Sequence, residues 1–455
     1  MKILVDENIP LAADLFGTLG EMQLAPGRAI TPDLPGLDRV EVMAIRSVTP
    51  ITRELLLKTP RLRAIGTATI GTDHIDMAAV EEAARCHGHP IRVFSAPGSN
   101  ADSVADYVFY AIFHLTQGQT LAGRSIGVVG VGNCGSRVAR RAAALGMTVL
   151  PHDPPRAEAE SGFRSLPIDE VVRADFVTFH VPLTRPGAGK HPTYHMINRE
   201  LLAKMRRDSF LLNACRGAVA DTADLVEVLR SRRIAGAVLD VYEGEPEPSA
   251  ELIRLAAIAT PHIAGYSIEG KRRGTIVIYR DICRALGLPE RADAIGLMSK
   301  GLSAPRGVEL PFPLCSDEGL TAEYALRALA AATHDIGACS EELKATLGKP
   351  DRGRLFDAMR RNYDRQYGRR DLSSYSVGIR IPPTRRAAGL PDTLCDPASN
   401  AEAPPALRRA IERCLDGFGV AVLRPGGGEP NFVLCPTVSQ EPRPASGSER
   451  ASGGG

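Results

Sequence analysis

The chain has 455 residues, about three times the length of an ordinary domain, so two or three domains are predicted rather than one small module. Hydrophobic residues make up 44% and charged residues 24%, as in typical globular chains. The 55 Lys and Arg residues nearly balance the 53 Asp and Glu residues, leaving a net charge of +2. This balance provides no broad basic field, so neither nucleic acid nor a membrane is expected as a partner.

The first ten residues, MKILVDENIP, lack the order of a basic segment followed by a long apolar one. Neither a signal peptide nor a membrane span is predicted there, and we expect a cytoplasmic protein. The nine cysteines are scattered and never form a CxxC pair. They are therefore expected to be reduced thiols, and no metal site is expected.

Short apolar runs alternate with amphipathic segments along the first hundred residues. Strands are expected at KILVDEN, EVMAIRS, RAIGTATI and RVFSAP, and helices over 9–19, 52–58 and 76–85. This alternation predicts a parallel sheet with helices on both faces. We interpret residues 1–99 as a substrate-binding domain, completed by a helix that returns to it within about 266–289. A long apolar helix over 99–117 connects it to the next domain.

A second alternation begins at SIGVVGVG, with strands expected at MTVLPHD, FVTFHVPL, SFLLNAC, AGAVLDV and AAIATPH. It predicts a second doubly wound sheet over residues 100–265. Residues 290–436 mix Pro-rich loops with a helix over 321–347 and a basic helix over 352–367, which indicates a third, α+β module. The Pro-, Ser- and Gly-rich residues 437–455 are expected to form a disordered tail.

Three glycines, Gly130, Gly132 and Gly135, have GxGxxG spacing between a predicted strand and a predicted helix. In this pattern the first permits a tight turn, the second lets the backbone approach a pyrophosphate, and the third allows the helix to pack closely. Asp153 ends the next strand, where a carboxylate accepts hydrogen bonds from a ribose diol and favours NAD over NADP. Arg156 could receive a 2′-phosphate instead, but we prefer a solvated arginine or a partner of the pyrophosphate.

Further polar residues follow later strands of this unit: Arg216 in NACRGAVAD, Asp240 and Glu245 in LDVYEGEP, and His262 in TPHIAGYS. The carboxyl ends of parallel strands are where such sheets bind ligands. A histidine can exchange a proton with a hydroxyl, a carboxylate can stabilise the charged ring, and an arginine can bind a carboxylate at two points. The set suits oxidation of a 2-hydroxy acid. We interpret Glu243 as a solvated acid.

In this order and with these neighbours, the residues resemble the D-isomer-specific 2-hydroxyacid dehydrogenases. The resemblance implies a flavodoxin-like and a Rossmann domain flanking a cleft, NAD as cofactor, and Arg216, Glu245 and His262 as the catalytic residues. It implies that Asp240 lies near the nicotinamide amide, and that Val181, where relatives have threonine, offers only backbone contact. The full set of implied cofactor contacts is Gly130, Gly132, Asn133, Cys134, Gly135, Asp153, Val181, Ala214, Cys215, Arg216, Asp240 and Gly265.

Several segments are similar to one member of that family that acts on a phosphorylated acid: MKILVDEN, IRSVT, GTATIGTDHID, NACRGAVAD and HIAGYSIEGKRRGT. That resemblance implies substrate contacts by Ser47, Thr69 and Tyr266. Weaker similarity in RLFDAMRRNYDRQYGRRDLSSYSV implies that the third module forms a homodimer. A phosphorylated substrate also requires another cation, for which Arg46 is the first candidate and the run 271–273 the second.

Two alternatives remain open at this stage. The catalytic set does not identify the acid, so a related dehydrogenase of 3-phosphoglycerate would carry the same residues. A different class of protein, an NAD(H)-sensing binding protein without turnover, could also use this fold, because fold alone does not define function.

Overall fold

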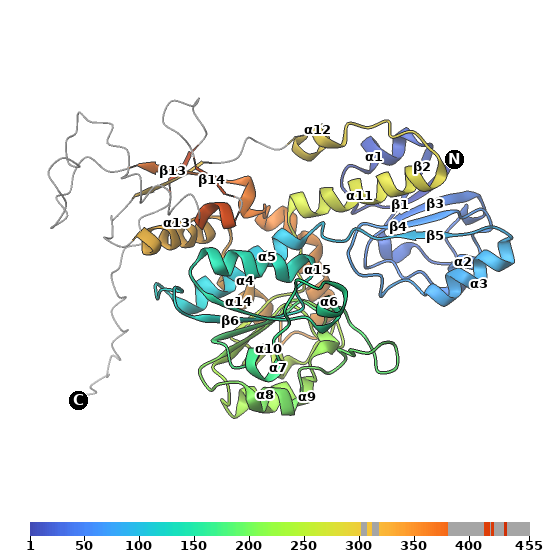
Figure 1. Cartoon of the computed structure of the whole chain (residues 1–455). Coiled ribbons are helices and arrows are strands. Elements are labelled where there is room, and N and C mark those ends of the chain that lie inside the picture. The colour runs from blue at the N-terminus through green and yellow to red at the C-terminus, as the bar shows by residue number, and fades with distance from the viewer. Residues whose placement is uncertain (302–306, 312–317, 381–413, 419, 423–431, 435–455) are drawn as a thin grey trace, which may run out of the picture.

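The computed structural model describes residues 1–301, 307–311, 318–380, 414–418, 420–422 and 432–434. Two parallel sheets with helices on both faces form most of the molecule, and a smaller sheet lies in the C-terminal part (Figure 1). The predicted fold class is therefore confirmed. Among the described residues, no helix combines the length and the apolar character needed to cross a membrane.

The first sheet has the strand order β2-β1-β3-β4-β5, with every pair parallel. Its strands are β1 (Lys2–Asp6), β2 (Glu21–Ala25), β3 (Val40–Ile45), β4 (Ala64–Thr67) and β5 (Arg92–Phe94). One face packs against α1 (Ala12–Leu15) and α11 (Ile268–Leu286), the other against α2 (Arg53–Leu57) and α3 (Met77–His87). The order is flavodoxin-like, so ligands are expected at the carboxyl ends of its strands.

The predicted helix over 9–19 is wrong in extent. Only α1 and a 3₁₀ turn at Phe16–Thr18 form there, and β2 follows as a strand that the sequence pattern did not predict. Strand β2 lies at the edge of the sheet, and four of its five residues are half-buried or exposed. An edge strand of this kind has too weak an apolar pattern to be recognised in the sequence.

The second sheet has the order β11-β10-β9-β8-β6-β7, again with parallel pairs. Its strands are β6 (Ser125–Val129), β7 (Thr148–His152), β8 (Phe176–Phe179), β9 (Phe210–Asn213), β10 (Gly236–Leu239) and β11 (Ile258–Ala259). The strand order reverses at β6, and such a switch point opens a crevice at the carboxyl ends of the strands.

Two sets of helices cover this second sheet. One face packs against α4 (Ala101–Thr116) and α5 (Asn133–Ala144). The other packs against α7 (Ile168–Val171), α8 (Arg199–Lys204), α9 (Thr222–Arg230) and α10 (Ala250–Leu255), while α6 (Pro154–Ala159) buries no residue. Burial on both faces explains why these strands are nearly continuous apolar runs in the sequence.

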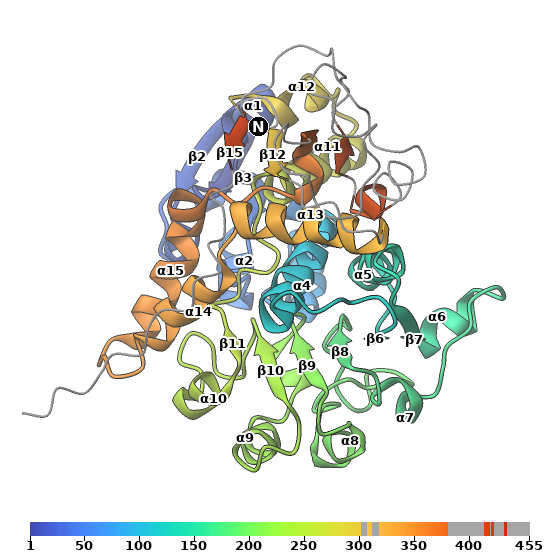
Figure 2. The ribbon, with the colours of Figure 1, turned by 90° about the vertical axis from the view of Figure 1, so that its left-hand side faces the viewer.

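The C-terminal module packs against both the second sheet and its helices. It contains α12 (Ala294–Ser299), β12 (Gly307–Pro311), α13 (Glu318–Thr333), α14 (Ile336–Lys344), α15 (Arg352–Tyr367), β13 (Ser376–Arg380), β14 (Ala421–Val422) and β15 (Phe432–Leu434). Its described strands pair in parallel in the order β14-β13-β12-β15. Helices α13 and α14 lie against α4, as Figure 2 shows. The expected tail over 437–455 lies outside the described residues.

The predicted single helix over 321–347 is wrong, because two helices form. Helix α13 ends at Thr333, and α14 begins after Asp335. The Asp335 carboxylate accepts a hydrogen bond of 2.8 Å from the Ala338 N–H, which caps the new helix. Aspartate is a favoured capping residue because it satisfies a free N–H at a helix start. The apolar period alone could not distinguish this restart from one continuous helix.

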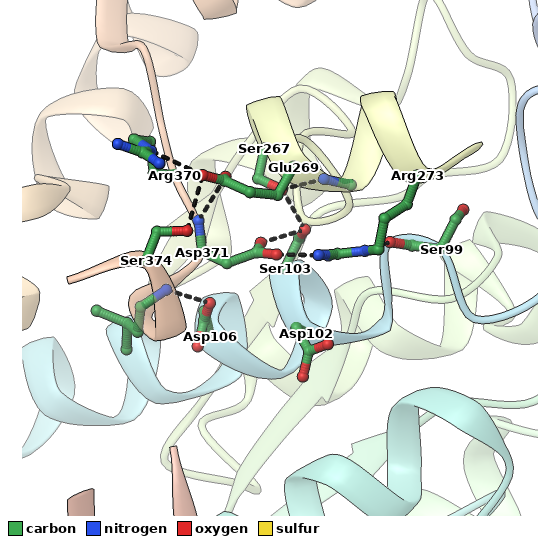
Figure 3. Close-up of polar contacts among 12 residues, drawn as sticks. Ser99, Asp102, Ser103, Asp106, Ser267, Glu269, Arg273, Arg370, Asp371 and Ser374 are labelled. Carbon is green, nitrogen blue, oxygen red and sulfur yellow. Dashed lines mark hydrogen bonds and ion pairs between the residues drawn. The ribbon is translucent and has the colours of Figure 1, made fainter. Parts of the chain in front are cut away.

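A buried polar network joins α4, α11 and the segment that follows α15 (Figure 3). The Asp371 carboxylate is fully buried and pairs with Arg273 of α11 at 2.5 Å. It also accepts a hydrogen bond of 2.8 Å from Ser103 of α4. One residue on, the Leu372 N–H donates to Asp106 of α4 at 2.9 Å. The C-terminal segment is thus bonded to both helices.

Glu269, near the start of α11, extends this network. Its carboxylate accepts hydrogen bonds of 2.7 Å from both Arg370 and Ser374. The chain passes from the first sheet to the second through α4 and returns to the first through α11, which packs on β4 and β5. Because these helices connect the two sheets, the network bonds the C-terminal segment to both connections.

Removing the central carboxylate of this network tests its contribution to stability. Asp371→Ala would leave Arg273 without its buried partner, so we expect the free energy of unfolding to fall by about 3–5 kcal/mol. Asp208→Ala is the matched control, because Asp208 pairs with Arg206 where the Asp208 side chain is 67% exposed. We expect that variant to lose less than about 1 kcal/mol. Urea denaturation measures both, and equal small losses would contradict the assignment.

Candidate active site

The turn between β6 and α5 has the geometry needed to bind an anion. Gly130 has a φ of +85°. A Cβ atom on Gly135 would lie 1.9 Å from the Gly130 carbonyl oxygen, so only glycine lets α5 pack this closely. A Cβ atom on Gly132 would meet nothing within 4 Å, and α5 begins there without a side-chain cap. No side chain therefore caps the N–H groups of the first turn of α5, which fits binding of the pyrophosphate of a dinucleotide there.

Asp153 lies beside this turn at the end of β7. Its carboxylate accepts hydrogen bonds from the Val131 N–H at 2.7 Å and the Arg156 N–H at 3.0 Å. Arg156 donates to the Val131 carbonyl oxygen at 2.8 Å and to Glu160 at 2.9 Å. Arg156 is thus held by its own chain rather than left to bind a phosphate. A carboxylate in this place favours the unphosphorylated ribose of NAD.

The other sequence-predicted cofactor residues line the same edge of the second sheet or adjoin it. Val181 packs beside Gly130, and Ala214 is partly buried against the core. Burial raises the pKa of the Cys134 thiol to about 11 and also raises the pKa of the Cys215 thiol, so both are neutral near pH 7. Asn133 begins α5. Gly265 lies so close to α4 that a Cβ atom would be 2.2 Å from the Asn100 amide nitrogen.

His262 and Glu245 form a direct pair at the carboxyl edge of this sheet. The His262 Nδ1 atom lies 2.8 Å from the Glu245 Oε2 atom. The other oxygen of Glu245 accepts a hydrogen bond of 3.0 Å from the Tyr242 N–H. A proton on Nδ1 is therefore held by the carboxylate, and Nε2 is the nitrogen available for proton exchange.

The pair shifts both pKa values in opposite directions. Burial by itself lowers the pKa of His262, but the adjacent Glu245 carboxylate outweighs it, so that pKa is raised. Burial raises the pKa of Glu245, and the neighbouring imidazole reverses this, so that pKa is lowered. Each partner stabilises the charged form of the other. Glu245 is therefore ionised, and His262 changes charge above its usual range.

Asp240 positions the loop that carries His262. Its carboxylate is 1% exposed and accepts hydrogen bonds from the Thr260 hydroxyl at 2.6 Å, the Ile263 N–H at 2.7 Å and the Ala264 N–H at 2.8 Å. His262, between these residues, has a φ of +57°, a conformation that a side chain disfavours. The bonds to Asp240 hold the chain in this strained turn, a feature common at functional sites.

Arg216 lies at the end of β9, the strand next to β10. Its guanidinium reaches the first domain, where it bonds Asp73 at 2.9 Å and fills the space beside Gly71. The loops after β4 and β9 therefore meet at Arg216. The guanidinium is about one-third exposed, so it can exchange Asp73 for another carboxylate. The structure thus places Arg216 between the two domains and His262 and Glu245 together on the second.

Glu243 is not the solvated acid that the sequence suggested. It accepts hydrogen bonds from His195 at 2.8 Å and from the Thr222 hydroxyl at 2.6 Å. The two glutamates of YEGEP therefore have different partners: Glu245 pairs with His262, and Glu243 bonds His195 and Thr222.

Within the described part of the chain, no group of three or more His, Cys, Asp or Glu side chains could hold a metal ion.

The predicted substrate residues come from both domains. Ser47 is exposed just after β3, and the Thr69 hydroxyl lies 2.7 Å from the Thr67 hydroxyl. The Tyr266 ring has the Arg46 guanidinium 5.8 Å from its centroid and the Lys271 Nζ atom 4.1 Å from it. Arg46 and Lys271, the two candidates for binding the substrate phosphate, therefore lie at the same aromatic ring and need not be alternatives.

The rest of the basic run is used elsewhere. Arg272 donates to the carbonyl oxygens of Leu297 and Met298, and Arg273 belongs to the buried network. Sequence reasoning missed one residue altogether: Arg360 of α15 lies 3.7 Å from the Glu245 carboxylate. The basic character of the segment 352–370 was visible in the sequence, but nothing in it indicated that one arginine would point toward His262.

The fold and this constellation define a nucleotide-binding oxidoreductase of the 2-hydroxyacid dehydrogenase class. The D-isomer specific 2-hydroxyacid dehydrogenase NAD-binding domain matches residues 110–264. A D-lactate dehydrogenase of Aquifex aeolicus, complexed with NAD and lactic acid, is 26% identical with a TM-score of 0.51, covering 63% of this chain and 96% of its own. An NAD-dependent formate dehydrogenase of Staphylococcus aureus, in complex with NAD, is 25% identical with a TM-score of 0.51, covering 65% and 98%.

Relatives named erythronate-4-phosphate dehydrogenase are more similar in sequence. The one from Salinibacter ruber is 41% identical, over 85% of this chain and 97% of its own length. The one from Escherichia coli is 40% identical, over 83% and 94%. The chain belongs to the erythronate-4-phosphate dehydrogenase family, within the D-isomer-specific 2-hydroxyacid dehydrogenases, and it is an NAD-dependent dehydrogenase.

The close approach of Gly135 to Gly130 generates a binding prediction. Gly135→Ala must push α5 away from β6, and we expect the Kd for NADH to rise by about ten- to a hundredfold, because the anion-binding N–H groups move. Gly17→Ala is the control, because a Cβ atom there meets nothing within 4 Å. Fluorescence titration with NADH measures both. Unchanged binding by Gly135→Ala would show that this packing does not shape the site.

The His262–Glu245 pair generates a prediction on pH. The sequence predicts that His262 is the base of the oxidation, a role that requires a neutral ring, so on this hypothesis kcat/KM for the hydroxy acid should fall as the pH drops through the raised pKa. Glu245→Gln removes the charge that raises this pKa. We therefore expect the low-pH fall of kcat/KM, called the acid limb of the pH profile, to move to lower pH, and we expect kcat to fall. Glu243→Gln, whose carboxylate bonds His195, should leave the limb in place. A limb that does not move in Glu245→Gln would remove Glu245 from this role.

Proposed function

We propose that this chain oxidises 4-phospho-D-erythronate to 2-oxo-3-hydroxy-4-phosphobutanoate with NAD, a step of pyridoxal 5′-phosphate (vitamin B6) synthesis. The observation that carries the proposal is the 2.8 Å contact between His262 and Glu245, which follow strands of the same parallel sheet as the anion-binding turn. The names of the relatives supply the acid. The cations around Tyr266 suit a substrate with a second anionic group.

The chain's own residues would act on the substrate as follows. Neutral His262 takes the proton of the C2 hydroxyl at Nε2, and Glu245 stabilises the imidazolium that results. Arg216 exchanges Asp73 for the substrate carboxylate, which it can bind at two points, and polarises the C2 oxygen. Bound NAD supplies the acceptor for the hydride that leaves C2. The substrate thus loses one hydride and one proton, which balances the oxidation.

The remaining predicted residues would hold the two ligands. We assign the pyrophosphate to the turn at Gly132, the ribose diol to Asp153, and further cofactor contacts to the residues named above. Ser47, Thr69 and Tyr266 would contact the substrate, while Arg46 and Lys271 would neutralise its phosphate. Asp240, whose carboxylate is used within the chain, would act mainly by positioning His262.

The assembly and location are also part of the proposal. We infer a homodimer formed through the C-terminal module and a cytoplasmic location, the latter supported by the use of NAD and by free cysteines in the described residues. Sedimentation equilibrium of the full chain measures the first. A monomer would remove the dimer from the proposal without affecting the chemistry.

Measuring NADH formation with one acid at a time tests the proposed reaction. We expect rapid turnover with 4-phospho-D-erythronate, little with 3-phosphoglycerate, and a loss of about 10²–10⁴-fold in His262→Ala, because the proton acceptor is gone. Faster turnover with 3-phosphoglycerate would instead identify that acid as the substrate. Tight NADH binding without turnover on any acid would instead favour an NAD(H)-sensing protein.

A further inference from the structure

The C-terminal module contributes a charged side chain to the site on the second sheet. Helix α15 carries Arg360, whose side chain is 11% exposed and lies 3.7 Å from the Glu245 carboxylate. The positive charge of Arg360 also lowers the pKa of the Tyr266 hydroxyl, which places the two side chains close together. Tyr266 is four residues after His262, so this contact lies beside the proton-exchanging pair. An arginine this deeply buried requires anionic partners to offset its loss of hydration.

Three chain segments meet at Tyr266, and each brings a cation. Arg46 follows β3 of the first sheet, Lys271 lies in the first turn of α11, and Arg360 comes from α15. Arg46 and Lys271 lie over the Tyr266 ring, and Arg360 lies 3.7 Å from the Glu245 carboxylate. The electrostatic effect is visible on the ring itself: burial raises the pKa of Tyr266, but Arg360, Arg46 and Lys271 together lower it to about 8.

The acids nearest Arg360 are already engaged. Glu245 holds His262 at 2.8 Å and the Tyr242 N–H at 3.0 Å. Asp357, on the same helix as Arg360, pairs with Arg28 of the first domain at 2.5 Å. Neither Glu245 nor Asp357 is therefore an exclusive partner of Arg360.

Two of these cations also retain unused donors. Among the residues that the structure describes, neither the buried Nη1 atom of Arg46 nor the buried Nε atom of Arg360 has a hydrogen-bond partner. Arg46 as a residue is only 8% exposed. Buried donors without partners are rare in proteins because leaving them unsatisfied costs stability. Their presence in one cluster indicates that an anionic ligand completes it.

We propose that Arg360 of the C-terminal module binds the phosphate group of the substrate, together with Arg46 and Lys271. A phosphate monoester has three terminal oxygens and can accept hydrogen bonds from several cations at once, which a planar carboxylate does less well. The substrate carboxylate is assigned to Arg216. This arginine lies elsewhere, where the second domain contacts Asp73 of the first domain. The module therefore determines specificity for a phosphorylated acid.

This inference rests on the proposed function, since it names the residue that recognises the phosphate of that substrate. The measured quantity is the ratio of kcat/KM for 4-phospho-D-erythronate to kcat/KM for D-erythronate, which lacks the phosphate. Arg360→Met should lower this ratio by about 10- to 100-fold, mainly through KM of the phosphorylated acid, because charge-assisted hydrogen bonds to phosphate are lost. Arg360→Lys, which keeps the charge, should lower it less.

Arg361→Met is the matched control, because Arg361 is the next residue of α15 and is exposed. Its ratio should equal that of the unmodified chain. A ratio that stays constant in Arg360→Met while both rates fall would mean that Arg360 acts only through Glu245, and it would overturn the proposal. If Arg360→Met fails to fold, as its thermal unfolding would reveal, Arg360→Lys carries the same comparison.

A binding measurement separates this inference from the proposed reaction. Inorganic phosphate should raise the Tm of the unmodified chain and of Arg361→Met in the presence of NADH, and should raise that of Arg360→Met less. If the unmodified chain shows this shift but does not oxidise 4-phospho-D-erythronate, the proposed function fails and the phosphate site stands. If all three proteins respond equally, the phosphate site fails, whatever the acid.

Discussion

The buried carboxylate of Asp371 is the constraint on which the arrangement of the site depends. It is bonded to Arg273 of α11 and Ser103 of α4, the two helices that connect the sheets (Figure 3). A buried ion pair is costly unless further hydrogen bonds satisfy it, and here Ser103 provides one. Because Asp371 follows α15 closely in the chain, the same contacts hold the segment after α15 against the start of α11.

The acids of the second sheet show how environment separates chemically similar groups. Asp240 is buried and uses its carboxylate on the backbone around His262, whereas Glu245 faces the imidazole itself. Glu243, only two residues away, points to His195. The strained backbone of His262 is therefore held by one acid and its ring by another.

Charge in the site is distributed over the whole chain. The negative groups that face His262 come from the second sheet, while the cations around Tyr266 come from the first sheet, α11 and the C-terminal module. Cations held apart on separate elements repel one another less until a ligand bridges them. A phosphorylated acid bound as proposed would contact all three regions.

The sequence by itself determined the two parallel sheets, the turn at Gly130–Gly135 and the family, because apolar periods and glycine spacing are local properties of the chain. It did not reveal β2, an edge strand with a weak apolar pattern, or the restart of the helix at Asp335. It singled out Glu245 and His262, and only the tertiary structure showed their contact and the different partner of Glu243. Arg360 lies almost a hundred residues from His262 in the sequence, and only the long-range packing of the C-terminal module places it 3.7 Å from the Glu245 carboxylate.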